Sequence, residues 1–189
     1  MRLDGQTVLV TGASRGLGRA IALAMAEEGA NVALAARDGQ ALNAVAAIIE
    51  QLGREVLIVC CDVRDPAAVK ALAERVLAEF GQVDTLVNSV GVAVRRPVTE
   101  LGVAEWDDVF DTLARGTLLV TQAVLPSMIA RKRGNIINLA APLERIEIPG
   151  FAAYTAAKYA VAGLTKTLAR ELRRHGINVN GLHPGGFAD

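Results

Sequence analysis

Short β-branched runs alternate with longer stretches of helical period along the whole chain, and this alternation constrains the fold more than any other feature. The runs Thr7–Val10 and Asn31–Ala36 lack a polar residue at every second position, as strands buried on both faces of a sheet do. The stretch Gly16–Glu28 between them places apolar residues on one face of a helix. Strict alternation of strands and helices predicts parallel strands joined by right-handed crossovers, with helices on both sheet faces.

Six strands of this kind are expected, and they make the fold class α/β, a doubly wound parallel sheet of the Rossmann type. With 189 residues, 52% of them hydrophobic, the chain can form one domain with a sizeable core. The other strands are predicted at Val56–Cys60, Thr85–Val87, Asn135–Leu139 and Ile177–Leu182. The other helices are predicted at Gln40–Leu52, from Asp65 and Pro66 onward, from about Val103 to Arg131, and at Ala153–Arg174.

Charge and composition exclude several classes of function. Lys and Arg total 20 and Asp and Glu total 20, so nothing favours a surface for nucleic acid or for anionic membranes. No apolar run approaches the roughly 20 residues of a membrane span, and the N-terminus runs directly into a strand pattern without a signal peptide. The adjacent Cys60 and Cys61 are interpreted as reduced, buried thiols. These features favour a cytoplasmic protein.

A glycine-rich turn joins the first strand to the first helix. Its three glycines permit a tight turn, a close approach of the backbone to a pyrophosphate, and close contact between helix and sheet. The N–H groups at the start of the helix favour phosphate binding there. The turn therefore predicts a dinucleotide site, in preference to an ordinary loop, formed by Thr11 together with Gly12, Ala13, Ser14, Arg15, Gly16, Leu17 and Gly18.

The end of the second strand distinguishes the two nicotinamide dinucleotides. An NAD site usually has an acid at this point, which binds the ribose 2′-OH. Here Arg37 follows the strand, and Arg15 lies in the glycine turn. Two guanidinium groups suit a 2′-phosphate by charge and by bidentate geometry. NADP(H) is therefore predicted in preference to NAD(H). NAD(H) remains the alternative, because Asp38 follows Arg37 directly and because the two arginines could simply be solvated surface residues.

A tyrosine and a lysine lie four residues apart on one face of the last long helix. They are Tyr154 and Lys158. A phenol with a pKa near 10 is a poor proton donor and acceptor at neutral pH. An ammonium beside it would lower that pKa and make the phenol a usable general acid–base. For the pair taken alone, an ordinary contact on a helix surface is the alternative.

Together these motifs resemble the short-chain dehydrogenase/reductase family, and the likeness runs from Leu3 to the last residue. The glycine turn matches the family's T-G-x-x-x-G-x-G, and Tyr154 with Lys158 matches Y-x-x-x-K. The resemblance implies that Tyr154 exchanges a proton with an alcohol or carbonyl, while Lys158 binds the nicotinamide ribose and tunes Tyr154. It also implies cofactor contacts at Asp62 and Val63 over the adenine, at Asn88 and Gly91 of the N-N-A-G strand end, and at Pro184 and Gly185 near the nicotinamide.

Three features depart from the family pattern. The catalytic serine position is Ala141, which cannot donate a hydrogen bond to a carbonyl oxygen. Losing such a donor costs on the order of a hundred- to a thousand-fold in rate. The helix asparagine that holds a water beside the lysine falls at Leu113, and the middle of N-N-A-G is Ser89 and Val90. The chain also lacks the usual C-terminal substrate-covering segment after Asp189, so impaired activity is expected.

Two functions are weighed against each other, and a third is disfavoured. The first is an NADP(H)-dependent oxidoreductase acting on a small-molecule alcohol or carbonyl. The second is a nucleotide-binding relative without catalysis, serving as a sensor or silent subunit. The third, a sugar-nucleotide epimerase, is disfavoured by the spacing of the glycines. No Cys/His cluster has the spacing of a metal site.

The sequence contains weaker signals for the kind of substrate and for the assembly of the chain. Arg95 and Arg96 follow the fourth strand on the pocket side, where they could meet an acidic substrate or belong to a solvated loop. Helices 103–131 and 153–174 are expected to pair two copies of the chain, giving a homo-oligomer. A dimer is favoured over a tetramer.

Overall fold

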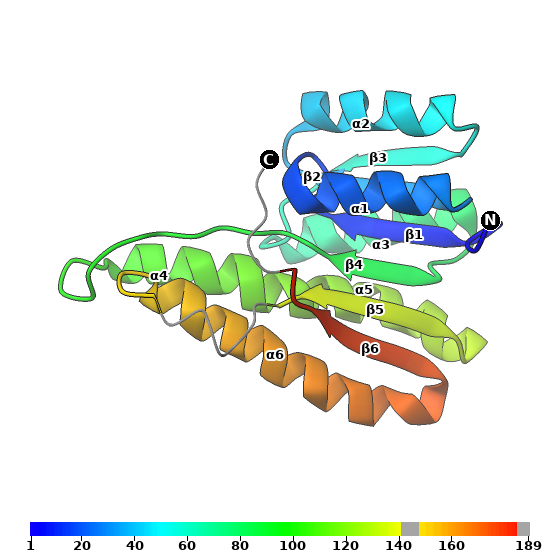
Figure 1. Cartoon of the computed structure of the whole chain (residues 1–189). Coiled ribbons are helices and arrows are strands. Elements are labelled where there is room, and N and C mark those ends of the chain that lie inside the picture. Colours follow the sequence, from blue (N-terminus) through cyan, green and yellow to red (C-terminus); the bar gives the residue numbers. More distant parts are fainter. Residues whose placement is uncertain (141–147, 185–189) are drawn as a thin grey trace.

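Six parallel strands form one sheet in the computed structural model, which describes residues 1–140 and 148–184 (Figure 1). The order across the sheet is β3-β2-β1-β4-β5-β6. Because β2 and β3 extend the sheet on one side of β1 and β4 begins the other side, the carboxyl ends of β1 and β4 form a topological switch point. The doubly wound α/β fold is thus confirmed, with strands β1 (Thr7–Thr11), β2 (Asn31–Ala36), β3 (Val56–Cys60), β4 (Thr85–Asn88), β5 (Gly134–Leu139) and β6 (Ile177–Leu182).

Helices pack on both faces of the sheet. Successive strand residues point to opposite faces, so Val8 and Val10 lie in one core cluster and Leu9 lies in the other. Burial on both sides explains why the strands show no polar alternation. The first cluster is closed by α1 (Gly16–Glu27) and α2 (Gly39–Gln51), and the second by α3 (Pro66–Phe80), α5 (Gly116–Arg131) and α6 (Ala152–Leu172).

Local signals in the sequence set several helix ends. The Asp65 carboxylate accepts a hydrogen bond from the Ala67 N–H at 2.8 Å, and Pro66 occupies the first helical position of α3. Gly81 ends the same helix with φ of +73°, a left-handed conformation that favours glycine. The start of α3 therefore follows the prediction made from Asp65 and Pro66.

The stretch predicted as one long helix contains a wider turn. It consists of α4 (Val103–Phe110), a π-helical turn η1 (Asp111–Arg115) and α5. The whole run has 29 residues and an apolar window with a mean hydropathy of 1.3, so by length and composition it could cross a membrane, contrary to expectation. Val120 and Val124 of α5 are buried against the sheet, and 33% of the apolar window is buried, so this packing accounts for part of the apolar composition.

The two cysteines differ in their surroundings. Cys61 is buried, and burial raises the pKa of its thiol to about 11. Cys60 is exposed at the end of β3, so the expectation that both thiols are buried is wrong for this one. Its sulfur lies beside Gly39, where a Cβ would approach to 2.8 Å. Both cysteines are free thiols, as expected.

Two helices extend beyond the sheet on the side where the strands end. Figure 1 shows α4 and the first part of α6 projecting past the carboxyl ends of β4 and β5. Tyr154 and Lys158 lie in this part of α6. The fold therefore brings the tyrosine–lysine pair and the glycine turn to the same edge of the sheet.

Candidate active site

The glycine turn after β1 packs directly against the end of β4. Gly12 has φ of +68°, and a Cβ there would lie 2.9 Å from the carbonyl carbon and oxygen of Ser89. A Cβ on Gly18 would collide with the Gly12 carbonyl oxygen. Thr11 fixes the same junction, because its Oγ1 accepts from the Ser89 N–H at 3.2 Å and donates to the Val87 carbonyl at 3.3 Å. Glycine is therefore required at both positions for this close approach.

Helix α1 begins without a side-chain cap. Arg15 precedes it in an extended conformation and forms no side-chain cap hydrogen bond with the first turn of the helix. The first N–H groups of α1 are consequently available at the positive end of the helix dipole. Ser14 and Leu17 are half-buried on either side of Arg15 and Gly16. This arrangement fits the pyrophosphate site that the sequence predicts.

The acid that follows the second strand serves a structural purpose. Asp38 caps α2, and its carboxylate accepts from the Ala41 N–H at 3.0 Å. Because its carboxylate caps α2, Asp38 is less available to bind a ribose 2′-OH. Asp38 therefore argues less strongly for NAD(H) than the sequence suggests. Arg37 directly before it and Arg15 in the glycine turn are both exposed.

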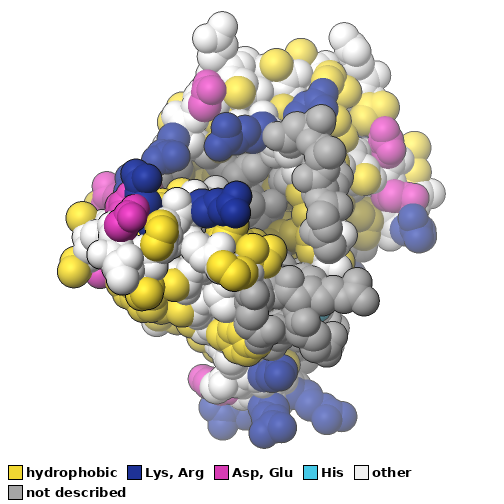
Figure 2. Space-filling view, turned by 60° about the vertical axis from the view of Figure 1, so that its left-hand side comes forward, with side chains coloured by type: hydrophobic (Ala, Val, Ile, Leu, Met, Phe, Trp, Pro, Cys, Tyr) yellow, Lys and Arg dark blue, Asp and Glu magenta, His cyan; other side chains and the backbone are white. Residues whose placement is uncertain are grey.

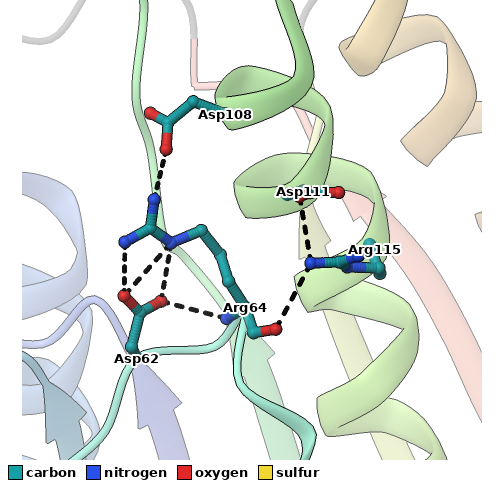
Figure 3. A network of polar contacts seen from close by, with 5 residues as sticks. All are labelled: Asp62, Arg64, Asp108, Asp111 and Arg115. Carbon is teal, nitrogen blue, oxygen red and sulfur yellow. Dashed lines mark hydrogen bonds and ion pairs between the residues drawn. The ribbon is translucent and has the colours of Figure 1, made fainter. Parts of the chain in front are cut away.

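Asp62, at the end of β3, forms a bidentate ion pair with Arg64 (Figure 3). Arg64 Nη2 donates to Asp62 Oδ2 at 2.6 Å, and the Arg64 backbone N–H donates to Oδ1 at 3.0 Å. The hydrogen bond from the Arg64 side chain is the largest cause that lowers the pKa of Asp62 to about 2. The carboxylate expected near the adenine is thus ionised and fixed in orientation.

The same arginine connects the loop after β3 to the helices beyond the sheet. Arg64 Nη1 pairs with Asp108 of α4. Arg115 of the π-helical turn pairs with Asp111 at 3.0 Å, and its Nη2 also reaches the Arg64 carbonyl oxygen at 3.4 Å. Figure 3 shows these five side chains from two separate segments converging on one network. The adenine side of the expected site is therefore tied to α4 and η1.

Val63 and Asn88 are both buried. Val63 packs on Gly116, where a Cβ would lie 2.7 Å from Val63 Cγ2. Asn88 Nδ2 donates to Asn138 Oδ1 at 2.9 Å, and Asn138 Nδ2 donates to Thr165 Oγ1 at 2.9 Å. These bonds tie β4, β5 and α6 together, so the side chain of Asn88 positions the strand end.

The tyrosine and lysine lie on one face of α6, as their spacing predicts. Lys158 Nζ lies 5.6 Å from the centroid of the Tyr154 ring and donates to the Leu139 carbonyl oxygen at 2.5 Å. Lys158 is 5% exposed, and burial lowers the pKa of its ammonium to about 8.

The pKa of the Tyr154 phenol is shifted in the direction opposite to the expectation. Burial raises the pKa of Tyr154, whereas the sequence predicts that the ammonium lowers it. The reason is geometric: the Lys158 ammonium donates to the Leu139 carbonyl oxygen, so the desolvation of the half-buried phenol dominates.

Leu113 is buried in the apolar cluster against which Tyr154 packs. It is 2% exposed and packs in an apolar cluster with Val109, Ala153 and Ala157, to which the Tyr154 ring also belongs. The position that holds a water in the resembling family is thus filled by hydrocarbon. Ala141 and Gly185 lie outside the described residues, while Gly91 and Pro184 are exposed at the strand ends.

Sequence reasoning missed two parts of this site. Arg64 was not singled out, although an acid and an arginine two residues apart after a strand could have indicated a local ion pair. The Leu139 carbonyl oxygen, which accepts from Lys158, has no sequence signal because every residue carries such a group.

Comparisons with known proteins identify the class. The family model of the short chain dehydrogenases matches residues 6–188, so the chain belongs to the short-chain dehydrogenase/reductase family. It is 41% identical over 181 residues to 3-oxoacyl-[acyl-carrier-protein] reductase FabG of Staphylococcus aureus, covering 95% of this chain and 74% of that protein. It is 39% identical over 186 residues to gluconate 5-dehydrogenase of Gluconobacter oxydans, covering 98% of this chain and 73% of that protein. Relatives are thus dehydrogenases and reductases acting on CH–OH or C=O groups.

Solved structures agree with the fold and with a nicotinamide cofactor. A metagenomic short-chain oxidoreductase in complex with NADP is 40% identical, with a TM-score of 0.94 over 98% of this chain and 85% of that one. An NAD+-bound xylitol dehydrogenase is 33% identical, also with a TM-score of 0.94, over 98% of this chain and 72% of that one. Because the two structures bind different dinucleotides, the comparison supports the cofactor class and leaves the preference to this chain's own residues.

Proposed function

We propose that this protein is an NADP(H)-dependent oxidoreductase that interconverts an alcohol and a carbonyl compound, with Tyr154 as general acid–base and Lys158 as its partner. The observation that carries the proposal is the contact between the Lys158 ammonium and the Tyr154 ring, at the sheet edge where the glycine turn lies. A buried lysine beside a half-buried tyrosine is costly in an ordinary helix, and such pairs are concentrated at functional sites.

The cradle at the switch point fits a dinucleotide. Side chains are excluded at Gly12 and Gly18, which leaves backbone where a pyrophosphate would need a close approach. Arg15 and Arg37 would hold a 2′-phosphate, and Asp62 with the backbone of Val63 would face the adenine. Lys158 would bind the nicotinamide ribose. A bound nicotinamide would supply the acceptor or donor of the hydride that leaves the alcohol carbon or reaches the carbonyl carbon.

Tyr154 would move the proton that accompanies the hydride. In the oxidising direction its phenolate oxygen takes the hydroxyl proton, and in the reducing direction its hydroxyl gives a proton to the carbonyl oxygen. A second positive group nearer the phenol would lower its raised pKa toward the working range. Release of the Lys158 ammonium from the Leu139 carbonyl toward a ribose hydroxyl and the phenol would have this effect.

Catalysis is proposed to be impaired. Leu113 fills the water position with a buried side chain, and Ala141 cannot donate to the substrate oxygen. A non-catalytic nucleotide-binding protein is the second candidate, and the burial of Leu113 in the apolar cluster beside Tyr154 is the observation that favours it. The two candidates agree on cofactor binding and differ on turnover.

A titration of NADPH and NADH, followed by nicotinamide fluorescence, tests the proposal. NADPH should bind more tightly than NADH, and Arg37→Gln should weaken NADPH binding by about tenfold or more, since a charge-assisted hydrogen bond to phosphate contributes roughly 1.5–3 kcal/mol. The exposed Arg19→Gln variant on α1 is the matched control and should bind both as the wild type does. Binding of neither dinucleotide would reject the proposed function.

Assembly and location follow as parts of the same proposal. A small-molecule substrate, a cytoplasmic location and a homo-oligomer formed through helices 103–131 and 153–174 are consistent with an enzyme of this family. Within that run, Trp106 and Val103 are exposed apolar side chains on α4. Analytical ultracentrifugation would measure whether the chain is a dimer.

A further inference from the structure

We infer that Arg64 is a positioning residue that couples the adenine end of the cofactor site to α4 and η1, the segments whose apolar face packs with Tyr154. Binding at the adenine end should therefore stabilise α4 and η1 before any substrate is present. The inference rests on the proposed function, because it takes Asp62 as the contact to the adenine. It goes beyond that function by giving the ion pairs of Figure 3 a purpose in the site.

Arg64 binds two carboxylates that belong to separate segments. Its Nε donates to Asp62 Oδ1 at 3.0 Å and its Nη2 donates to Asp62 Oδ2 at 2.6 Å, while its Nη1 pairs with Asp108 of α4. The guanidinium is a planar fork whose donors have fixed relative directions. Fixing its plane against Asp62 therefore also fixes the direction of Nη1 toward Asp108.

A second arginine joins the same loop to the π-helical turn. Arg115 Nη2 lies 3.4 Å from the Arg64 carbonyl oxygen and 3.0 Å from Asp111 Oδ2. Such turns inside longer helices are frequent at functional sites. Leu113 of the turn and Val109 of α4 are buried in the apolar cluster against which Tyr154 packs. The segments that Arg64 and Arg115 hold are thus the ones that pack beside the proposed acid–base.

Helix α4 is held to the rest of the molecule by few buried side chains. Of its residues only Val109 is buried, and Val103 is 76% exposed. Figure 1 shows α4 projecting beyond the sheet, and Figure 2, which brings that end forward, shows acidic, basic and hydrophobic side chains mixed over the face. Segments with few buried apolar contacts open locally, at a lower free energy than global unfolding. A single ion pair is therefore a measurable part of what keeps α4 closed.

A ligand at Asp62 would strengthen the link by restraining Arg64. The side chains of Arg64, Asp62 and Asp108 are 33%, 30% and 42% exposed, so water screens both ion pairs in the free protein. An adenine over Asp62 would exclude water from the first pair and strengthen it. A long side chain loses its rotamer freedom only once, so a restrained Arg64 binds Asp108 at a lower entropic cost. Opening of α4, which breaks the second pair, then becomes less favourable.

An apolar contact offers a competing route between the same segments. Val63 packs on Gly116, where a Cβ would lie 2.7 Å from Val63 Cγ2, so the loop after β3 also touches the start of α5 without Arg64. Replacing Arg64 leaves both of these residues in place. Variants of Arg64 therefore distinguish the two routes.

The test is hydrogen exchange followed by mass spectrometry, with and without 2′,5′-ADP, the adenine half of the cofactor. At saturating ligand, exchange in residues 103–115 of the wild type should slow by about two- to fivefold, the range for one partly exposed ion pair. The slowing should be lost in Arg64→Gln and in Asp108→Asn. It should be kept in Asp107→Asn, the matched control at the exposed neighbouring carboxylate.

Two other segments serve as internal references. Residues 11–18 should be protected in the wild type and in all three variants, because the glycine turn would bind the 5′-phosphate. Residues 166–172, at the far end of α6, should be unaffected, since a general stabilisation by the ligand would slow exchange there as well.

Slowing in residues 103–115 that persists in Arg64→Gln would assign the coupling to Val63 and overturn the inference. Wild-type slowing that is equal in residues 166–172, or that is absent from residues 103–115 while residues 11–18 are protected, would also overturn it and leave the proposed function standing. Absence of protection in residues 11–18 of the wild type would reject the proposed cofactor site, and the inference with it.

Discussion

Replacing Lys158 by methionine should stabilise the fold while removing the partner of Tyr154. Burial lowers the pKa of this lysine from 10.5 to about 8, and each pKa unit corresponds to roughly 1.4 kcal/mol, so keeping the ammonium buried at pH 7 costs about 3 kcal/mol. Methionine keeps the apolar stem but cannot donate to the Leu139 carbonyl, and losing a hydrogen bond from a charged donor costs about 2 kcal/mol. The expected net gain is therefore about 1 kcal/mol in the free energy of unfolding.

The pH dependence identifies the cause of that gain. The folded-state pKa of Lys158 lies below the unfolded value, so the cost of burial is fully present below pH 8. As the pH rises from about 8 to 10.5, the folded chain releases the proton while the unfolded chain keeps it, and the stability of the wild type rises toward that of the variant. The advantage of Lys158→Met should therefore shrink over this interval.

Urea denaturation of the cofactor-free protein, followed by circular dichroism at pH 7 and pH 9.5, measures both quantities. Lys166→Met, at an exposed lysine two turns further along α6, is the matched control and should show no such pH-dependent gain. A Lys158→Met variant no more stable than the wild type at pH 7, or one whose advantage is the same at both pH values, would refute the reasoning.

Two further variants test the departures from the family and the network in Figure 3. The double variant Leu113→Asn, Ala141→Ser should raise kcat by on the order of a hundred-fold by restoring a water site and a hydrogen-bond donor, and an unchanged kcat in steady-state assays would contradict this. Arg64→Gln should lower the free energy of unfolding by about 1 kcal/mol or less, because its partners Asp62 and Asp108 are partly exposed, and should weaken binding of 2′,5′-ADP in calorimetry. Unchanged 2′,5′-ADP affinity would show that Asp62 needs no fixed orientation.

Much of the fold could be predicted because it depends on local patterns. The apolar runs Asn31–Ala36 and Ile177–Leu182 are strands with the predicted boundaries. The cap at Asp65 and the glycine turn are also local, since capping and positive φ are properties of a few adjacent residues. The π-helical turn Asp111–Arg115 was not predictable, because it lies inside an uninterrupted helical pattern.

The sequence predicted which residues form the site better than it predicted their pKa values. Tyr154 and Lys158 lie on one face as their spacing requires. The direction of the Tyr154 pKa could not be predicted, since it depends on how much of the phenol is desolvated and on which acceptor binds the ammonium.

The sequence by itself determined the order of strands and helices, the positions that must be glycine, and the residue types available for proton transfer, because each depends on neighbours along the chain. Only the tertiary structure decided that Lys158 binds the Leu139 carbonyl, that Leu113 is buried in the apolar cluster against which Tyr154 packs, and that Arg96 pairs with Glu105. Those contacts join residues far apart in sequence, and their energies depend on burial and distance, which exist only once the chain has folded.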